Sequence, residues 1–194
     1  MTIPQTSKIF RSCIKITSWN IACINNPTGR KTNDTDFTDI LQDSDIICLQ
    51  ETNEAVELPD YRSFSSLRKS VKKASGGVVT LISNQINHAV SKVNDLSALS
   101  QDIIVVKLKQ SSLNIAKDIY IVNVYIRPSN SKLRHTKIKG SQTFETLNTI
   151  LNELNGKGEI ILCGDFNARI QTAPDYIINE DTVSYTHLTL PTKA

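Results

Sequence analysis

The sequence lacks the features that mark several large protein classes. No run of residues approaches the roughly 18 consecutive apolar residues of a membrane-spanning helix, and residues 1–12 contain no apolar core of a signal peptide. Internal repeats and low-complexity tracts are also missing. With 39% hydrophobic and 21% charged residues, the 194-residue chain has the composition of a globular domain. We therefore predict one intracellular domain, nuclear or cytoplasmic, that is neither secreted nor bound to a membrane.

The four cysteines show no Cys-x-x-Cys spacing. Cys48 and Cys163 lie inside apolar, strand-like runs, where a thiol usually behaves as a small buried hydrophobe. We expect reduced cysteines in a reducing compartment.

Acidic residues are missing between Ile119 and Phe144, although the net charge of +3 is too small to identify a polyanionic partner. The basic residues of that stretch are Arg127, Lys132, Arg134, Lys137 and Lys139. An earlier basic cluster comprises Arg62, Arg68, Lys69, Lys72 and Lys73. Both groups could neutralise phosphates, but a run of charges is more often a solvated surface.

Short apolar runs rich in β-branched residues predict buried strands. The predicted strands cover 14–19, 46–49, 78–82, 103–108, 119–124 and 160–163. Residues 84–101 give no clear pattern. Because the strands are too apolar to have one wet face and alternate with helices and loops, we predict an α/β protein whose sheets are covered on both sides.

Two helices are predicted from apolar spacing and caps. The first begins at Asp34 or Thr35 and repeats apolar residues at Phe37, Ile40 and Leu41. The second is capped by Ser141, has an apolar face of Phe144, Leu147, Leu151 and Leu154, and stops at Gly156.

Four polar residues share one placement. Asn20, Glu51, Tyr125 and Asp165 each lie at or just after the end of a predicted strand. Any one of them alone is more often a turn former, a solvated loop residue or a half-buried aromatic. Since ligands of α/β proteins bind where strands end, the joint pattern predicts a shared site.

Five strings carry a resemblance to a known family. They are ITSWN (16–20), IICLQET (46–52), SGGVV (75–79), NVYIRP (123–128) and GDFNAR (164–169). In this order and at these intervals they resemble the successive motifs of the endonuclease/exonuclease/phosphatase superfamily. The resemblance covers 15–181, and the Tyr-x-Arg-Pro and Asp-Phe-Asn-Ala-Arg forms most resemble the endonuclease domains of non-LTR retrotransposons, which nick target DNA before reverse transcription.

The resemblance implies a deoxyribonuclease-I-like fold, a four-layer α/β sandwich of two mixed β-sheets flanked by helices. It also implies roles for single residues. Glu51 matches the metal ligand, Asn20 a residue that supports the metal and the scissile phosphate, and Asp165 the carboxylate that orients or deprotonates the attacking water. Asn167 matches an amide that contacts the phosphate, and Tyr125 a hydroxyl donor to the phosphate or leaving group. An all-oxygen site of this kind suits Mg²⁺ or Mn²⁺ rather than zinc.

DNA is the partner that the resemblance implies, with a reverse transcriptase domain elsewhere in a full-length polyprotein. The oligomeric state is not predicted. Candidate nucleic-acid-binding residues are Arg127, Arg169, Lys132, Arg134, Lys72 and Lys73.

The sequence departs from the family pattern in two places. Ala22 stands where many of these nucleases have an acidic or amide residue, which weakens the metal shell. The final Ser-Asp-His motif is missing, because none of His88, His135 and His187 follows a Ser-Asp pair. We therefore expect a lead-in at 1–13, a partial domain at 14–181 that is incomplete at its C-terminus and inactive as it stands, and a non-native tail at 182–194.

Two alternatives stay open. The same fold and metal site would serve a phosphatase or phospholipase, and fold alone does not settle the substrate. A non-catalytic fragment that only binds nucleic acid would show salt-sensitive binding without cleavage.

Overall fold

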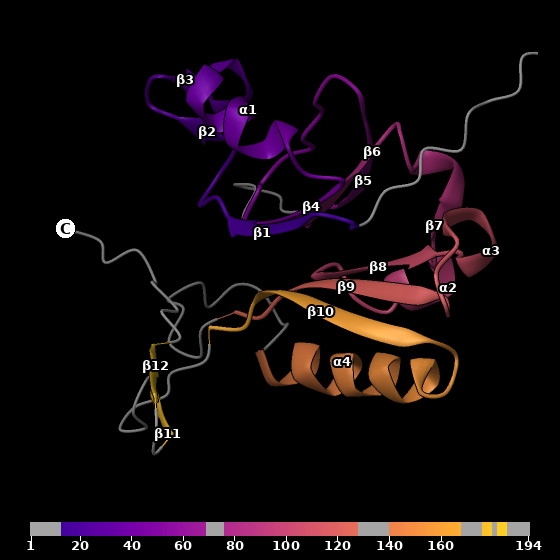
Figure 1. The fold of residues 1–194 in the computed structure, drawn as a ribbon. Coiled ribbons are helices and arrows are strands. Elements are labelled where there is room, and N and C mark those ends of the chain that lie inside the picture. The colour runs from indigo at the N-terminus through magenta and orange to yellow at the C-terminus, as the bar shows by residue number, and fades with distance from the viewer. Residues whose placement is uncertain (1–12, 69–75, 128–139, 168–175, 180–181, 186–194) are drawn as a thin grey trace, which may run out of the picture.

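The computed structural model describes residues 13–68, 76–127, 140–167, 176–179 and 182–185, and two sheets lie face to face in it between two helices (Figure 1). The first sheet has the order β1 (Ile16–Asn20), β4 (Ile46–Gln50), β6 (Val78–Ser83) and β5 (Tyr61–Ser66). The second has the order β10 (Glu159–Asp165), β9 (Ile119–Tyr125), β8 (Ile103–Leu108) and β7 (Val90–Lys92).

The helices complete a four-layer sandwich. In Figure 1, α1 (Thr35–Gln42) lies over the outer face of the first sheet, and α4 (Gly140–Leu154) runs along the outer face of the second. Smaller elements connect these layers. They are β2 (Asn25–Asn26), β3 (Gly29–Arg30), η1 (Lys31–Asn33), η2 (Asn87–Ala89), α2 (Asn94–Ser97) and α3 (Gln110–Leu113). After β10, β11 (Tyr176–Asn179) and β12 (Thr182–Tyr185) form a separate two-stranded sheet. The predicted fold class is confirmed.

Strand direction brings several strand ends to one edge of the sandwich. β1 is parallel to β4, and β9 is parallel to β10, whereas β6 and β8 run antiparallel to their neighbours. The register places Asn20 beside Gln50 and Tyr125 beside Asp165. Each sheet therefore presents two adjacent carboxyl ends, and we call this edge of the sandwich the strand-end edge.

Three apolar clusters fill the spaces between the four layers. Along β4, Ile46 and Cys48 face the second sheet, while Ile47 and Leu49 belong to the cluster that contains α1. All four side chains are fully buried. The third cluster joins the second sheet to Leu147, Ile150 and Leu154 of α4. Both faces of each sheet are covered, as their apolar strands predict.

A buried amide pair joins the two sheets close to the strand-end edge. Gln50 of β4 donates from Nε2 to Oδ1 of Asn123 on β9 at 2.8 Å, and the two residues are 1% and 0% exposed. Asn123 in turn donates from Nδ2 to the Val79 carbonyl at 3.0 Å and to Oγ1 of Thr80 at 3.2 Å. Because buried amides need partners, this network fixes β9 over β4 and β6 at one offset.

The structure corrects several details of the sequence interpretation. Ile40 is 59% exposed and Phe144 is 47% exposed, so neither packs on the core as predicted. The buried face of α4 contains Ile150 instead, which lies three residues after Leu147 and four before Leu154 and so shares one side of the helix with them. The side chain of Ser141, its predicted cap, lies outside the described residues. β5, β7, α2, α3 and the β2–β3 hairpin were not predicted.

The end signals of the two predicted helices are confirmed. Asp34 caps α1 by accepting from the Asp36 N–H at 3.0 Å, and Gly156 follows α4 with a φ of +77°. Cys48 is buried and Cys163 packs partly buried against the same apolar cluster, and all four cysteines are free. None of the described helices is both long and apolar enough to cross a bilayer.

Candidate active site

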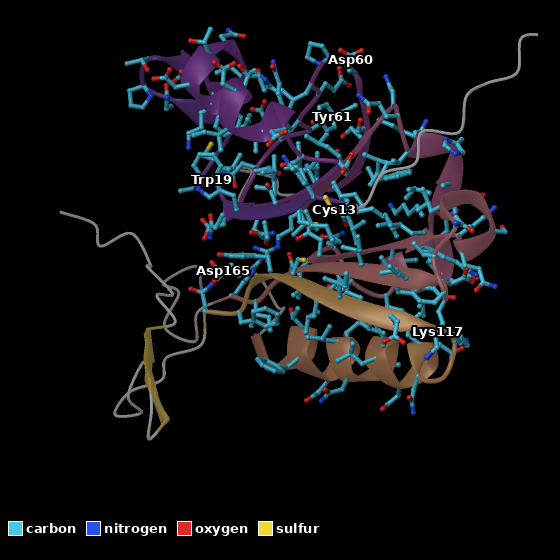
Figure 2. All side chains as sticks on the ribbon, viewed as in Figure 1. Cys13, Trp19, Asp60, Tyr61, Lys117 and Asp165 are labelled. Atoms are coloured by element: carbon cyan, nitrogen blue, oxygen red, sulfur yellow. The ribbon has the colours of Figure 1, made fainter. Side chains whose placement is uncertain are left out.

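The strand-end edge gathers the polar residues that the sequence singled out. Asn20 ends β1, Glu51 follows β4, Tyr125 ends β9 and Asp165 ends β10. Figure 2 shows Asp165 at the end of β10, on the side of the molecule where β1 also ends. The predicted residues thus come from both sheets and meet where the sheets face each other.

Asn20 bridges the two carboxylates. Its Nδ2 donates to Oε1 of Glu51 at 2.9 Å and to Oδ2 of Asp165 at 2.6 Å. Its Oδ1 accepts from the Ala22 N–H at 3.0 Å, which fixes the direction of the amide. In this arrangement Asn20 supports the carboxylates with its nitrogen. A direct bond from Asn20 to a metal would require the amide to turn over, so its role as a metal ligand stays a prediction.

Asn167 holds the other side of Asp165. Its backbone N–H donates to Oδ1 of Asp165 at 2.9 Å, and its Nδ2 lies 2.6 Å from the Ile126 carbonyl and 3.3 Å from Oδ2 of Asp165. The Ile126 N–H donates to the Asp165 carbonyl at 2.8 Å. The ends of β9 and β10 are therefore tied together, and both oxygens of Asp165 are directed by donors.

A glycine sets the approach of β10 to β9. Gly164 pairs with Val124, has a φ of +143°, and a Cβ added to it would lie 1.9 Å from the Val124 carbonyl oxygen. Such a contact is far inside van der Waals distance, so this position admits glycine alone.

Backbone strain accumulates beside the site. Ala22 and Glu51 adopt left-handed conformations with φ of +48° and +53°, which residues other than glycine rarely adopt. Backbone hydrogen bonds between the two loops hold this geometry, from the Cys23 N–H to the Glu51 carbonyl at 2.7 Å and from the Ile24 N–H to the Thr52 carbonyl at 3.0 Å. Strain that the surroundings hold in place in this way is typical of functional sites.

Tyr125 lies against the carboxylates with its ring buried. It is 6% exposed, and burial, together with the charge of Glu51 and a hydrogen bond to that residue, raises the pKa of its phenol well above the ordinary range. The nearby Arg68 guanidinium opposes this rise. Tyr125 therefore keeps its proton at neutral pH and can donate it in a hydrogen bond.

Arg68 and Asp102 form a buried ion pair next to Tyr125. Their side chains are 7% and 1% exposed, and both Nε and Nη2 of Arg68 lie 2.5 Å from Oδ1 of Asp102. The Arg68 guanidinium lies over the Tyr125 ring, 5.3 Å from its centroid. Sequence analysis placed Arg68 in a cluster of basic residues that could be solvated or bind phosphate, and it did not single out Asp102.

Arg127 is the predicted nucleic-acid-binding residue that the structure describes, and it is 6% exposed. Burial, followed by the like charge of Arg68, lowers the pKa of its guanidinium from the ordinary value, while Asp102 opposes that effect. Arg127 thus belongs to the charged group around Asp102 rather than to an open basic loop. The other five candidates, Arg169, Lys132, Arg134, Lys72 and Lys73, lie outside the described residues, as do His135 and His187. His88 is exposed on η2, as predicted.

The donor set at the strand-end edge fits a hard divalent cation. Glu51 and Asp165 supply carboxylate oxygens, and Mg²⁺ is commonly bound through one or two carboxylates with water and substrate completing its shell. Within the described part of the chain, no three His, Cys, Asp or Glu side chains gather as they would in a site made by protein ligands alone. Glu51 would therefore hold such an ion together with its waters, with Asp165 beside it.

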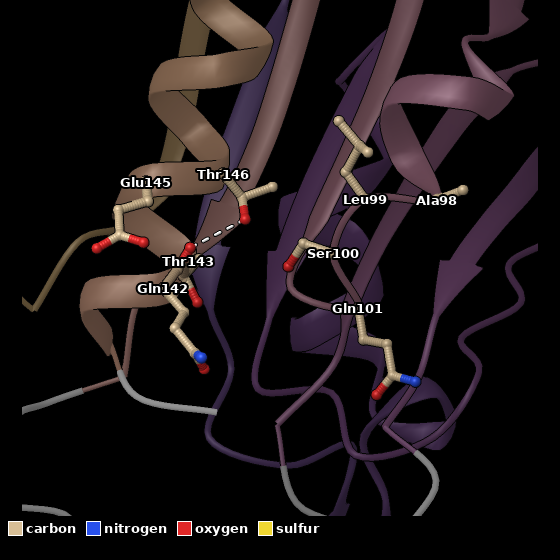
Figure 3. Close-up of a pocket in the computed structure, with 8 residues that line it drawn as sticks. All are labelled: Ala98, Leu99, Ser100, Gln101, Gln142, Thr143, Glu145 and Thr146. Atoms are coloured by element: carbon tan, nitrogen blue, oxygen red, sulfur yellow. Dashed lines mark hydrogen bonds between the residues drawn. The ribbon is translucent and has the colours of Figure 1, made fainter. Parts of the chain in front are cut away.

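A hollow in the surface lies apart from these residues. It has a volume of about 470 Å³ between the α2–β8 connection and the start of α4 (Figure 3). Glu145 is the carboxylate in its lining, and Thr146 donates to the Gln142 carbonyl at 2.9 Å beside it. Because it contains no pair of carboxylates, it does not resemble the strand-end edge in its chemistry.

The chain is similar to a known protein family and to two solved structures. The model of the Endonuclease/Exonuclease/phosphatase family matches residues 17–183. An AP endonuclease from Leishmania major is similar in structure, with a TM-score of 0.58 at 16% identity over 78% of this chain. An AP endonuclease from Archaeoglobus fulgidus gives a TM-score of 0.49 at 19% identity over 87% of this chain. The chain spans 54% and 62% of those two proteins. No curated protein sequence matches it.

Proposed function

Because the chain belongs to the endonuclease/exonuclease/phosphatase family, we propose that it is a metal-dependent phosphodiesterase domain of the kind that nicks DNA in non-LTR retrotransposons. The observation that carries this proposal is the bridge from Asn20 to both Glu51 and Asp165. The Tyr-Ile-Arg-Pro and Asp-Phe-Asn-Ala-Arg strings support the retrotransposon type. A reverse transcriptase domain would then belong to the same polyprotein.

Glu51 would hold the Mg²⁺ or Mn²⁺ ion at the strand-end edge, with water and substrate oxygens completing its shell. When bound, such an ion supplies positive charge that stabilises the phosphate in the transition state. The remaining chemistry comes from the protein. Asn20 keeps the two carboxylates at a fixed separation, and the interactions of Asn167 direct the oxygens of Asp165.

Asp165 is the general base of the proposed reaction. One of its oxygens accepts the proton of a water molecule that attacks phosphorus, and the bond from phosphorus to the leaving oxygen then breaks. Tyr125 keeps its phenolic proton because burial and Glu51 raise its pKa, so it donates a hydrogen bond to a phosphate oxygen or to the leaving oxygen. The leaving oxygen takes up a proton from solvent, so the single-strand nick has one hydroxyl end and one phosphate end.

Because the Ser-Asp-His string is missing, the sequence predicts an inactive chain, and we propose that any nicking supported by the remaining site residues is slow. Groups that act as one catalytic unit are strongly non-additive, so the lack of one member costs orders of magnitude in rate.

The metal role of Glu51 is tested by Mn²⁺ binding measured by electron paramagnetic resonance, alongside conversion of supercoiled plasmid to nicked circles in Mg²⁺. Glu51→Gln is expected to weaken Mn²⁺ binding and to remove any nicking. Glu54→Gln is a matched control, because Glu54 lies in the same loop but pairs with Arg30 at 2.9 Å instead. Equal Mn²⁺ affinity in the wild-type chain and in Glu51→Gln would overturn the proposal.

Substrate class is tested in the same preparation. A plasmid and a duplex oligonucleotide with one abasic site are compared with an inositol phosphate. We expect cleavage of the ordinary duplex, with weaker activity at higher salt because phosphate contacts release counterions. Release of inorganic phosphate from the inositol phosphate without any nicking would favour the phosphatase alternative.

A further inference from the structure

The ion pair behind Tyr125 is unusual for its burial. Arg68 and Asp102 are among the least exposed charged side chains of the described chain, yet neither is part of the Asn20 bridge. A buried ion pair is weak evidence for stability, since removing two charges from water offsets much of their attraction. Its position beside a catalytic candidate therefore calls for another explanation.

We infer that Arg68 is a positioning residue for Tyr125: fixed by Asp102, its guanidinium lies over the phenol ring, 5.3 Å from the centroid, and holds the ring toward Glu51. This inference rests on the proposed function, in which Tyr125 donates a hydrogen bond to the substrate. Arginine suits the role, because its planar cation can stack on an aromatic face while its edge pairs with a carboxylate.

Asp102 is connected to Tyr125 by the backbone as well as through Arg68. Its carbonyl accepts from the Tyr125 N–H at 2.9 Å. The same residue thus holds the main chain of Tyr125 and, through the ion pair, the cation over its ring. A displacement of Asp102 would move both the main chain of Tyr125 and the guanidinium over its ring. The position of the ring therefore depends on Asp102 in two ways.

The glycine pair before β6 provides the space for the guanidinium. A Cβ added to Gly76 would lie 2.3 Å from Nη1 and 2.7 Å from Cζ of Arg68. The loop of Gly76 is fixed, since its N–H donates to Oδ1 of Asn53 at 2.6 Å and its carbonyl accepts from the Asn53 N–H at 2.8 Å. Gly76 therefore has a steric role in addition to its turn conformation, and a methyl group there would push Arg68 away without changing any charge.

The chain offers two matched controls. Gly156 has a φ of +77°, against +78° for Gly76, but a Cβ at Gly156 meets nothing within 4 Å. Alanine at Gly156 therefore reproduces the backbone strain without the contact. Lys107 lies over the Tyr120 ring at 5.5 Å, so Lys107→Met removes a cation from a different tyrosine.

The first test is ¹⁹F NMR of the full chain labelled with 3-fluorotyrosine, without metal or substrate. The Tyr125 line is assigned from its loss in Tyr125→Phe. Arg68→Met and Gly76→Ala are expected to shift and narrow this line, as the ring loses the cation and gains motion, and Arg68→Lys is expected to restore it in part. Lys107→Met should shift the Tyr120 line alone, and Gly156→Ala should shift neither.

The second test is a double-mutant cycle on plasmid nicking, which asks whether Arg68 acts through Tyr125. Arg68→Met is expected to reduce kcat about tenfold with little change in KM, and to cause less than about a twofold further loss when Tyr125 is already phenylalanine. Equal losses in both backgrounds would overturn the inference. So would an unchanged Tyr125 line in an Arg68→Met chain that keeps its circular dichroism spectrum.

The two tests separate the inference from the proposed function. If the wild-type chain neither binds Mn²⁺ nor nicks DNA, the proposed function fails, while the ¹⁹F line still decides whether Arg68 holds Tyr125. If nicking depends on Glu51 but the ¹⁹F line of Tyr125 is the same in Arg68→Met as in the wild-type chain, the proposed function stands and the inference fails.

Discussion

The two ends of the sandwich differ in how far their charged side chains are exposed to solvent. At the strand-end edge, amides and carboxylates are buried or half-buried and bonded to one another, and the Arg68–Asp102 pair is nearly inaccessible to solvent. At the opposite end, where β10 begins, Lys117 pairs with Glu159 at 2.9 Å with side chains 66% and 65% exposed (Figure 2). Water screens the second kind of pair and not the first. Charged residues at the strand-end edge should therefore matter far more than similar residues at the other end.

The largest effect is expected from Asp165→Asn. The amide keeps the shape of the side chain but cannot accept a proton from water, so nicking should fall by about 10²- to 10⁴-fold. Asp118→Asn at the opposite end is the control and should leave the rate unchanged. Equal rates for Asp165→Asn and the wild-type chain would remove Asp165 from the mechanism.

Asp102→Ala comes next and acts on stability. It leaves the cation of Arg68 buried without its partner, which typically costs about 3 to 5 kcal/mol. Urea denaturation followed by circular dichroism measures this loss. If Asp102→Ala lowered the free energy of unfolding as little as removing an exposed ion pair does, the burial of Asp102 would not distinguish the two ends of the sandwich.

Asn123→Leu should have a smaller effect on stability. The side chain has a similar volume, but Nε2 of Gln50 loses its 2.8 Å acceptor, and a buried donor left without this partner costs about 1 to 3 kcal/mol. The same urea experiment applies, with Gln50→Leu combined with Asn123→Leu as a check. The double variant should recover part of the stability, because both partners of the hydrogen bond are then apolar.

Asp118→Asn should have the smallest effect on stability. Its hydrogen bond with Lys107 lowers the pKa of the Asp118 carboxyl, so the pair stabilises the folded state above the ordinary carboxyl pKa of about 3.9. The contribution is lost as the pH falls through the lowered folded-state pKa. The stability difference between the variant and the wild-type chain should therefore shrink in acid and in high salt. A difference that persists in both would contradict the screening argument.

The central strands and the position of the strand-end edge could be predicted from the sequence, because buried strands have a recognisable apolar pattern. Residues 46–49, 103–108 and 119–124 are mostly apolar runs. Glu51 and Tyr125, which follow the first and the last of them, lie at the strand-end edge as expected, whereas the antiparallel strand β8 ends at the opposite edge. β5 was missed because it lies at the end of its sheet, where its serines and an exposed arginine give no alternation. Phe144 was placed on the core face because spacing alone does not distinguish it from the neighbouring face that carries Ile150.

The ion pair was beyond sequence reasoning for a different reason. Arg68 and Asp102 are 34 residues apart, and nothing near either residue marks it as buried. Gly76-Gly77 was the available signal, but the sequence analysis used it only as part of the SGGVV string that resembles a family motif. Only the packing of Arg68 against Gly76 reveals that a glycine there makes room for a side chain.

Gly164 links the assembly of the sheet to the chemistry at its end. Sliding β10 along β9 by one residue would turn its side chains to the opposite faces and set a Cβ against the Val124 carbonyl. In the observed register the glycine faces that carbonyl and Asp165 lies opposite Tyr125. Gly164 thus disfavours a one-residue slip that would displace the aspartate from the tyrosine.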